Sequence, residues 1–220
     1  MRKRLIFTSL CLAGHAGYAQ SSLPKGTVQL GGISYSQQHW EDATYGSSIT
    51  DYYTFGVAPQ VGYFVAPGWV LGLGLNYGAV KQRYATTGTA YYNTQQSRSY
   101  QIGPFVQRYQ MFTDQFGLTG TLGAFYAHGS SDNQGYNSTD YYTGHGSGNS
   151  LSATLTPGLV YLPVRRLALS ASLGSLSYGY GRGTQRNSDG STRDTKSSSF
   201  GTFFGLSYLT LSGTYFFRRD

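Results

Sequence analysis

Hydrophobic and polar residues alternate with a period of two along much of the chain, most regularly between Tyr53 and Tyr77. Every second residue from Tyr53 to Val65 is apolar or aromatic, and the alternation resumes after Pro67-Gly68, from Trp69 onward. Successive side chains of a β-strand point to opposite faces, so this period predicts strands. We expect a β-hairpin with one apolar face and one face of small and polar residues.

The same alternation recurs elsewhere and predicts eight strands in total, joined by short turns and long polar loops in strict alternation. The short turns are predicted at Pro67-Gly68, at Thr113-Asp114 and from Pro163 to Arg166. The long loops are predicted at 37–50, 84–96, 128–150 and 182–198. This layout is typical of an all-β, eight-stranded antiparallel up-and-down transmembrane β-barrel whose short turns and termini are periplasmic.

Glycines and prolines mark expected irregularities within these strands. The alternation changes phase at Gly31-Gly32 and again near Gly174, which indicates β-bulges. Pro59, Pro104 and Pro157 fall on the apolar face of their strands. Proline cannot donate a ladder hydrogen bond, so each of them predicts a local kink or bulge.

The composition fits a membrane protein that crosses with strands. Charged residues make up 11% of the 220-residue chain, against ~25% in a typical soluble domain, while glycine (31) and tyrosine (21) are abundant. The mean hydropathy is nevertheless negative at -0.32, and no apolar run approaches the ~20 residues of a membrane helix. Alternating strands reconcile these observations, because half of their residues are polar or small.

Residues 1–19 are predicted to be a secretory signal peptide, leaving 20–220 as one barrel domain. Arg2, Lys3 and Arg4 form a basic region, an apolar stretch follows, and Gly17-Tyr18-Ala19 fits a cleavage site. Cleavage removes Cys11, the single cysteine, so no disulfide or thiolate metal site is expected. The formal charge falls from +7 to +4 with those three basic residues, which weakens any case for a nucleic-acid partner.

The positions of the aromatic residues favour a lipid-facing apolar face over a soluble sandwich core. A sandwich core would place aromatics in the middle of strands, whereas membrane interfaces select aromatic girdles at both ends of an aliphatic band. The predicted loop-side girdle consists of Tyr53, Tyr77, Tyr100 and Tyr126, and the turn-side girdle of Tyr63, Trp69, Phe116, Tyr161 and Phe217.

The opposite face is predicted to line a lumen that side chains and water fill. An eight-stranded barrel is about wide enough for side chains to occupy its interior. The larger residues expected there are Gln60, Asn76, Gln101, Gln107, Phe64, Phe105 and Phe125. The inward strand positions carry no ring of charge that would select ions, so a blocked interior is favoured over a continuous pore.

Three basic residues lie on the outward face near the loop ends of adjacent strands. If the hairpin pairs symmetrically, Arg83 lies opposite Arg98, an unfavourable like-charge pair that an anion could bridge. Together with Lys81 they form a candidate contact for lipopolysaccharide phosphates. The alternative is that these side chains simply extend to the polar interface.

The sequence offers no candidate catalytic residue, metal site or cofactor. His39, His128 and His145 are scattered over predicted loops, without the spacing that metal ligands require. No serine, histidine and aspartate set has a strand context that would support catalysis. The loops are instead rich in Tyr, Ser, Gly and Asn, a composition found in adaptable binding surfaces.

The leader, the opening KGTVQLGGISYS, the recurrent proline-bearing strands and the aromatic carboxy-terminal strand together resemble the outer-membrane β-barrel domain family. The resemblance is to small eight-stranded barrels of the OmpA, OmpX and OmpW types, in particular the Bacteroidetes members. It departs at Arg218-Arg219-Asp220, where such barrels often end on the aromatic residue. The resemblance implies a bacterial outer-membrane location, contact with lipopolysaccharide and phospholipid, and insertion by the barrel-assembly machinery.

The sequence therefore predicts a non-enzymatic outer-membrane protein with a structural or surface-interaction role, in which the extracellular loops contact an unknown ligand. One alternative is a narrow porin-like channel for small solutes, and another is an outer-membrane enzyme that modifies lipid or peptide. A secreted β-sandwich adhesin is a further alternative.

Overall fold

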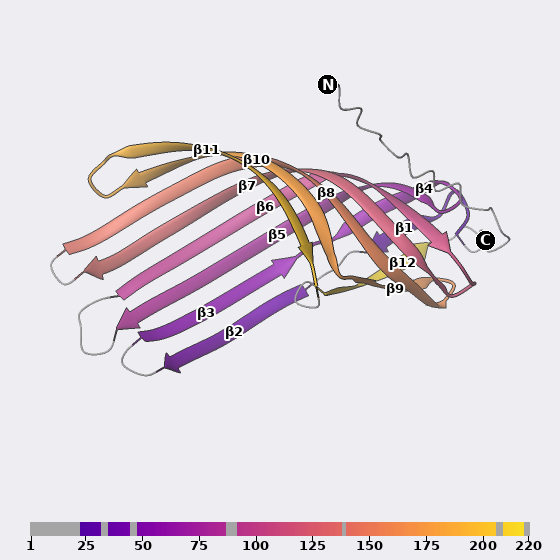
Figure 1. Ribbon diagram of the computed structural model, residues 1–220, viewed down its shortest axis with the longest axis horizontal. Helices are drawn as coiled ribbons and strands as arrows, with labels where there is room; N and C mark the ends of the chain where they lie inside the picture. The colour runs from indigo at the N-terminus through magenta and orange to yellow at the C-terminus, as the bar shows by residue number, and fades with distance from the viewer. Residues whose placement is uncertain are drawn as a thin grey trace, which may run out of the picture.

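The computed structural model describes residues 23–31, 35–44, 48–86, 92–137, 140–205 and 209–217, which form one antiparallel sheet (Figure 1). The predicted signal peptide lies outside these ranges. No helix among the described residues is long and apolar enough to cross a membrane. The strands are β1 (Val28–Gly31), β2 (Tyr35–Thr44), β3 (Ser48–Val57), β4 (Gln60–Ala66), β5 (Trp69–Thr86), β6 (Tyr92–Met111), β7 (Phe116–Asn137), β8 (Asp140–Val164), β9 (Leu167–Ser172), β10 (Gly174–Asn187), β11 (Thr192–Phe204) and β12 (Thr210–Phe217).

These twelve strands make eight passes of the chain, in the predicted up-and-down order. Four passes are each divided in two, as β1 and β2, β3 and β4, β9 and β10, and β11 and β12, while β5 to β8 are unbroken. Pro59 lies at one division, where its missing N–H interrupts the ladder between β3 and β4. The all-β antiparallel barrel fold is thereby confirmed, with the described residues divided among twelve strands instead of eight.

The turn half of the sheet closes into a ring, whereas the loop half spreads open. The ring runs from β8 through β7, β6, β5, β4, β1, β12 and β9 and back to β8. In the loop half β3 replaces β4 beside β5, and β10 replaces β9 beside β8. The two outermost strands of this half, β2 and β11, lie on opposite sides of the fan in Figure 1.

The four predicted long loops are wrong, because nearly all of their residues belong to paired strands. Residues 128–150 lie largely in the β7–β8 hairpin, where His128 pairs with Asn149 and Asn137 with Asp140. The other three regions are likewise covered by β2 and β3, by the ends of β5 and β6, and by β10 and β11. Polar composition misled the prediction: strand formation needs only cross-strand backbone bonds, which Gly, Ser, Thr and Tyr can all provide.

The phase shift predicted near Gly174 is confirmed as a one-residue bulge. Ser172 pairs with Gly158, but Leu176 pairs with Leu155, so four steps on one strand face three on the other. Gly174 has φ +140°, and an added Cβ would lie 1.7 Å from the carbonyl oxygen of Phe203, so this position requires glycine.

A comparable shift separates β1 from β2. Gly31 pairs with Gln60 and Tyr35 with Val57, so four steps along the first pass oppose three along the second. The predicted bulge at Gly31-Gly32 therefore agrees with the register on either side, although Gly32 itself lies outside the described residues.

The core of the protein is the inside of the closed ring. Phe64 is fully buried there and packs against Tyr109 (ring centroids 5.7 Å apart) and Phe216 (5.8 Å). Tyr109 and Phe216 in turn meet edge to face at 6.1 Å. Aliphatic residues complete this lumen plug, and its members are Leu23, Phe64, Val70, Phe105, Tyr109, Met111, Val160, Leu162, Ala168 and Phe216.

Glycines on the inward face make room for these rings. An added Cβ at Gly72 would lie 2.4 Å from the ring of Phe105, and one at Gly123 would lie 2.2 Å from the ring of Phe125. The abundance of glycine is therefore partly a packing requirement, because large aromatic side chains in a narrow ring need bare backbone beside them.

Replacing Phe64 by alanine is expected to lower the free energy of unfolding by about 3–5 kcal/mol, because it leaves a cavity among rings that cannot collapse fully. Urea titration of the refolded protein measures the effect. Phe112→Ala in the β6–β7 turn, where the residue is 61% exposed, is the matched control and should change stability little. An equal loss in both variants would contradict the assignment of the core.

Candidate functional surfaces

The outer face of the closed ring is apolar and uncovered. Leu71, Leu73 and Leu75 on β5 are 52%, 53% and 52% exposed, whereas the residues between them face the lumen. Ile102 on β6 and Leu122 on β7 continue this surface with similar exposure. In a soluble domain most large aliphatic side chains face the core. Here they point outward around the ring, which is the inverse arrangement.

Aromatic residues lie toward both ends of this outward band. Tyr77 packs against Tyr100 at 5.1 Å, and Phe116 stacks on Tyr161 at 4.6 Å. The residues predicted as girdles that are more than a third exposed are Tyr53, Tyr63, Trp69, Tyr100, Phe116, Tyr126 and Phe217, while Tyr77 and Tyr161 are half-buried by their ring contacts.

Arg108 stabilises the β4–β5 turn next to this band. Its guanidinium lies 5.0 Å from the centre of the Trp69 ring and donates a 3.0 Å hydrogen bond to the carbonyl oxygen of Pro67. This cation–π contact and hydrogen bond fix the ring at the turn end of β5.

A polar network closes the lumen above the aromatic cluster. The Tyr109 hydroxyl donates to Gln29 Oε1 at 3.1 Å, and Gln29 Nε2 donates to Gln107 Oε1 at 2.9 Å. Gln29 is 2% exposed, so its amide depends on these partners. At the turn end the buried Leu23 accepts a hydrogen bond from the Gly68 N–H. Sequence reasoning missed Tyr109, Gln29 and Leu23, although the alternation from Phe105 and Gln107 places Tyr109 inward.

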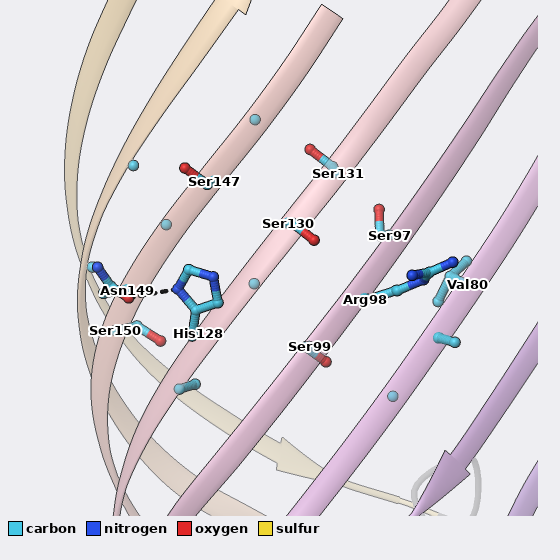
Figure 2. A pocket seen from close by; sticks show the side chains of 18 of the residues that line it. Val80, Ser97, Arg98, Ser99, His128, Ser130, Ser131, Ser147, Asn149 and Ser150 are labelled. Carbon is cyan, nitrogen blue, oxygen red and sulfur yellow. Dashed lines mark hydrogen bonds between the residues drawn. The ribbon is translucent and has the colours of Figure 1, made fainter.

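The open half holds a polar cavity of about 880 Å³, lined mostly by positions on the inward face of the sheet. Arg98, His128, Asn149 and Arg182, which alternate to the outward face, also border it. Figure 2 shows the wall, with serine hydroxyls from β6, β7 and β8 distributed over it. Asn76 lines this cavity, and Gln101 donates to Ser152 Oγ at 3.4 Å. Of the remaining predicted lumen residues, Phe64 and Phe105 are buried, and Gln60, Gln107 and Phe125 are half-buried.

The predicted pairing of Arg83 with Arg98 is wrong. Arg83 lies opposite Thr94 on β6 and opposite Asp51 on β3, while Arg98 lies opposite Ala79. The predicted register assumed a long loop over residues 84–96. In the structure β5 and β6 stay paired up to Ala85 and Tyr92, inside that range, so the cross-strand partners differ. Lys81, Arg83 and Arg98 are all exposed, and Lys81, which lies opposite Gln96, is a diagonal cross-strand neighbour of Arg98.

The two histidines on β7 and β8 belong to the outward face. His128 Nδ1 lies 2.8 Å from Asn149 Oδ1, which also accepts from the Tyr126 hydroxyl at 2.8 Å. His145 Nδ1 lies 2.7 Å from Asp132 Oδ1 across the same hairpin. Among the described residues, no three His, Cys, Asp or Glu side chains are grouped closely enough to hold a metal ion.

The hairpin tips carry tyrosines and tight turns. Tyr92, Tyr136 and Tyr141 are consecutive cross-strand neighbours on β6, β7 and β8. At the β10–β11 tip the Ser191 N–H donates to Asp189 Oδ1 at 2.8 Å. The Ser191 hydroxyl and N–H hold the pKa of this exposed carboxyl below its ordinary value.

No protein-family model matches the chain, and no curated protein is significantly similar to it in sequence. Solved structures with a similar fold include a major outer membrane protein from Thermus thermophilus (17% identity, 88% of this chain and 98% of that chain, TM-score 0.41). The outer membrane protease OmpT from Escherichia coli (10%, 87% and 79%, 0.47) and the outer membrane protein OprG from Pseudomonas aeruginosa (14%, 90% and 99%, 0.44) are others. At these values the likeness assigns neither family nor function.

Replacing Tyr109 by phenylalanine is expected to cost about 1–3 kcal/mol of stability, because Gln29 Oε1 then stays buried without its donor. The double variant Tyr109→Phe/Gln29→Leu should be closer to the wild type than Tyr109→Phe alone, since the orphaned acceptor is gone. Urea titration of the wild type, of Tyr109→Phe and Gln29→Leu singly, and of the double variant tests this coupling. Strictly additive losses would contradict the proposed network.

Proposed function

We propose that the protein is a non-enzymatic barrel of the bacterial outer membrane that presents a sheet of protruding hairpins for contact with an external ligand. The observation that supports membrane insertion best is the outward band of exposed Leu, Ile and Val around the closed ring. On β5 this band runs from Trp69 to Tyr77, nine residues, and a membrane-spanning β-strand needs ~9–11. Aromatics at its two ends suit the two interfaces.

The closed, plugged ring supports a structural rather than a conducting role. Phe64, Tyr109 and Phe216 fill its centre, and the Gln29 network lies across the same lumen. A porin-like channel would require these side chains to move out of the lumen. No observation favours a conducting role. Catalysis is likewise not favoured, since His128 is hydrogen-bonded to Asn149 and His145 to Asp132 rather than to a nucleophile.

The hairpins support a surface-interaction role because they extend well beyond the apolar band. β8 has 25 residues, about 85 Å of strand at ~3.4 Å per residue, more than twice what a membrane span uses. Its far end carries Tyr141, which forms a cross-strand row with Tyr136 on β7 and Tyr92 on β6. Tyrosine offers a large, rigid contact area at a low entropic cost, so this row is the proposed ligand contact.

The lipid and assembly partners follow from the same location. Lys81, Arg83 and Arg98 are proposed to extend toward head groups of lipopolysaccharide, each as a separate snorkelling side chain. Residues 1–19 are proposed as the export signal, and insertion as the task of the barrel-assembly machinery.

Membrane insertion predicts that Leu73→Arg destabilises the protein by about 2–4 kcal/mol in phosphatidylcholine vesicles, because the charge enters the middle of the lipid-facing band. Urea titration monitored by tryptophan fluorescence measures this loss. Asn76→Arg, which places the same charge in the polar cavity, is the matched control and should be nearly neutral. A soluble β-sandwich adhesin would tolerate Leu73→Arg, since Leu73 is 53% exposed.

The surface role predicts loss of binding when the tip of the β7–β8 hairpin is removed. Residues 132–145 would be replaced by Asn-Gly between the paired Ser131 and Gly146, which preserves the register. Cells displaying this variant should lose adhesion to the immobilised oligosaccharides or matrix proteins that the wild type binds. An equivalent shortening between Gln185 and Arg193 removes no tyrosine and should leave adhesion intact; equal binding by both variants would contradict the proposal.

A further inference from the structure

The outward face carries a like-charge pair that the sequence alone did not reveal. Arg182 on β10 lies directly opposite Lys196 on β11, and residues directly opposite in an antiparallel pair share a face. Arg182 points outward with Tyr180, whose hydroxyl accepts a 3.0 Å hydrogen bond from Arg182 Nε. Two cations with Cβ atoms about 5 Å apart are unfavourable neighbours unless something between them is negative.

The described part of the protein does not supply that negative charge. Within it, neither Arg182 nor Lys196 has a carboxylate at salt-bridge distance, and the ion pair of His145 with Asp132 lies on a different hairpin. The nearest acidic residue on this face along β11 is Asp194, which accepts a 2.8 Å hydrogen bond from the Thr184 hydroxyl. The two cations therefore have no salt-bridge partner among the described residues, and an external anion can bind between them beside Asp194.

Neighbouring strands add further donors to the same row. Asn149 on β8 lies opposite Arg182, and His128 on β7 lies opposite Asn149. Asn149 Oδ1 is occupied by the Tyr126 hydroxyl and His128 Nδ1, and Figure 2 shows its nitrogen turned away from His128. The amide N–H groups of Asn149 thus remain donors beside Arg182.

The position of this row relates it to the membrane. On β7, β8 and β10 the row comes two residues beyond an outward apolar or aromatic side chain of the band, with Tyr126 before His128, Leu151 before Asn149 and Tyr180 before Arg182. On β11, Lys196 lies four residues beyond the outward Phe200. The Arg182 guanidinium also lies 5.6 Å from the centre of the Tyr180 ring, which holds it at the edge of the band. An anion bound here would sit where lipid head groups begin.

We propose that Arg182, Lys196 and Asn149 form a binding site for the phosphate of an anionic membrane lipid. A guanidinium can bind a phosphate through two parallel N–H donors, and the lysine ammonium adds a point charge from the next strand. The inference rests on the proposed membrane location. It goes beyond that proposal because it assigns a particular lipid contact to particular side chains.

The test measures binding of short-chain phosphatidic acid to the detergent-solubilised full chain by native mass spectrometry, with phosphatidylcholine and inorganic phosphate as comparison ligands. Arg182→Gln/Lys196→Gln should weaken phosphatidic acid binding by about tenfold or more, since each basic residue near a head group contributes appreciably. Lys196→Arg keeps the charge and should retain binding. Lys81→Gln/Arg98→Gln removes the same charge from positions that are not opposite each other, and should have a smaller effect.

Equal losses in the two double variants would overturn the site in favour of general attraction to a basic surface. Unchanged binding in Arg182→Gln/Lys196→Gln would overturn it outright, and equal affinity for inorganic phosphate would overturn the lipid assignment. Insertion of each protein into phosphatidylcholine vesicles is measured separately. The readout is heat-modifiable migration of the protein on a gel. Failure of the wild type to insert counts against the membrane location, whereas normal insertion with unchanged lipid binding counts against the site alone.

Discussion

Phe64 packs between Tyr109 and Phe216 at the centre of the closed ring, and the rest of the structure depends on this contact. The three rings come from β4, β6 and β12, so their packing holds together passes that are far apart in sequence. The large buried side chains occupy inward positions of the strands. The outward positions of the same strands carry exposed aliphatic side chains. The plug and the apolar band are two results of one alternation.

Closure of the ring also depends on local departures from regular strand geometry. The bulge at Gly174 shifts the register of the seventh pass against β8, which pairs with β9 before the bulge and with β10 after it, while β9 also pairs with β12. Gly72 and Gly123 leave space for the rings of Phe105 and Phe125. A narrow barrel tolerates large inward residues only where a neighbouring position has no side chain, which is why aromatic and glycine residues are both abundant.

Beyond the ring, the same ladders continue into hairpins that need no hydrophobic core. Their stability comes from cross-strand hydrogen bonding and pairwise contacts such as His145 with Asp132. This extension determines which charges face one another. Arg83 is opposite Asp51 and Thr94, whereas Arg182 and Lys196 face each other, so the electrostatics of the surface follow from the register of the hairpins.

The sequence by itself determined the all-β fold, the order of the passes, the positions of the short turns and the apolar face, because each depends on a local period of two and on turn residues. It also indicated Phe64 and Phe105 as inward residues. It did not determine where strands end, since Gly-, Ser- and Tyr-rich segments pair as readily as they form loops once a neighbour is present. The partners of Tyr109, Gln29 and Arg182 were decided only by the tertiary structure, because cross-strand register and ring closure join residues that are distant along the chain.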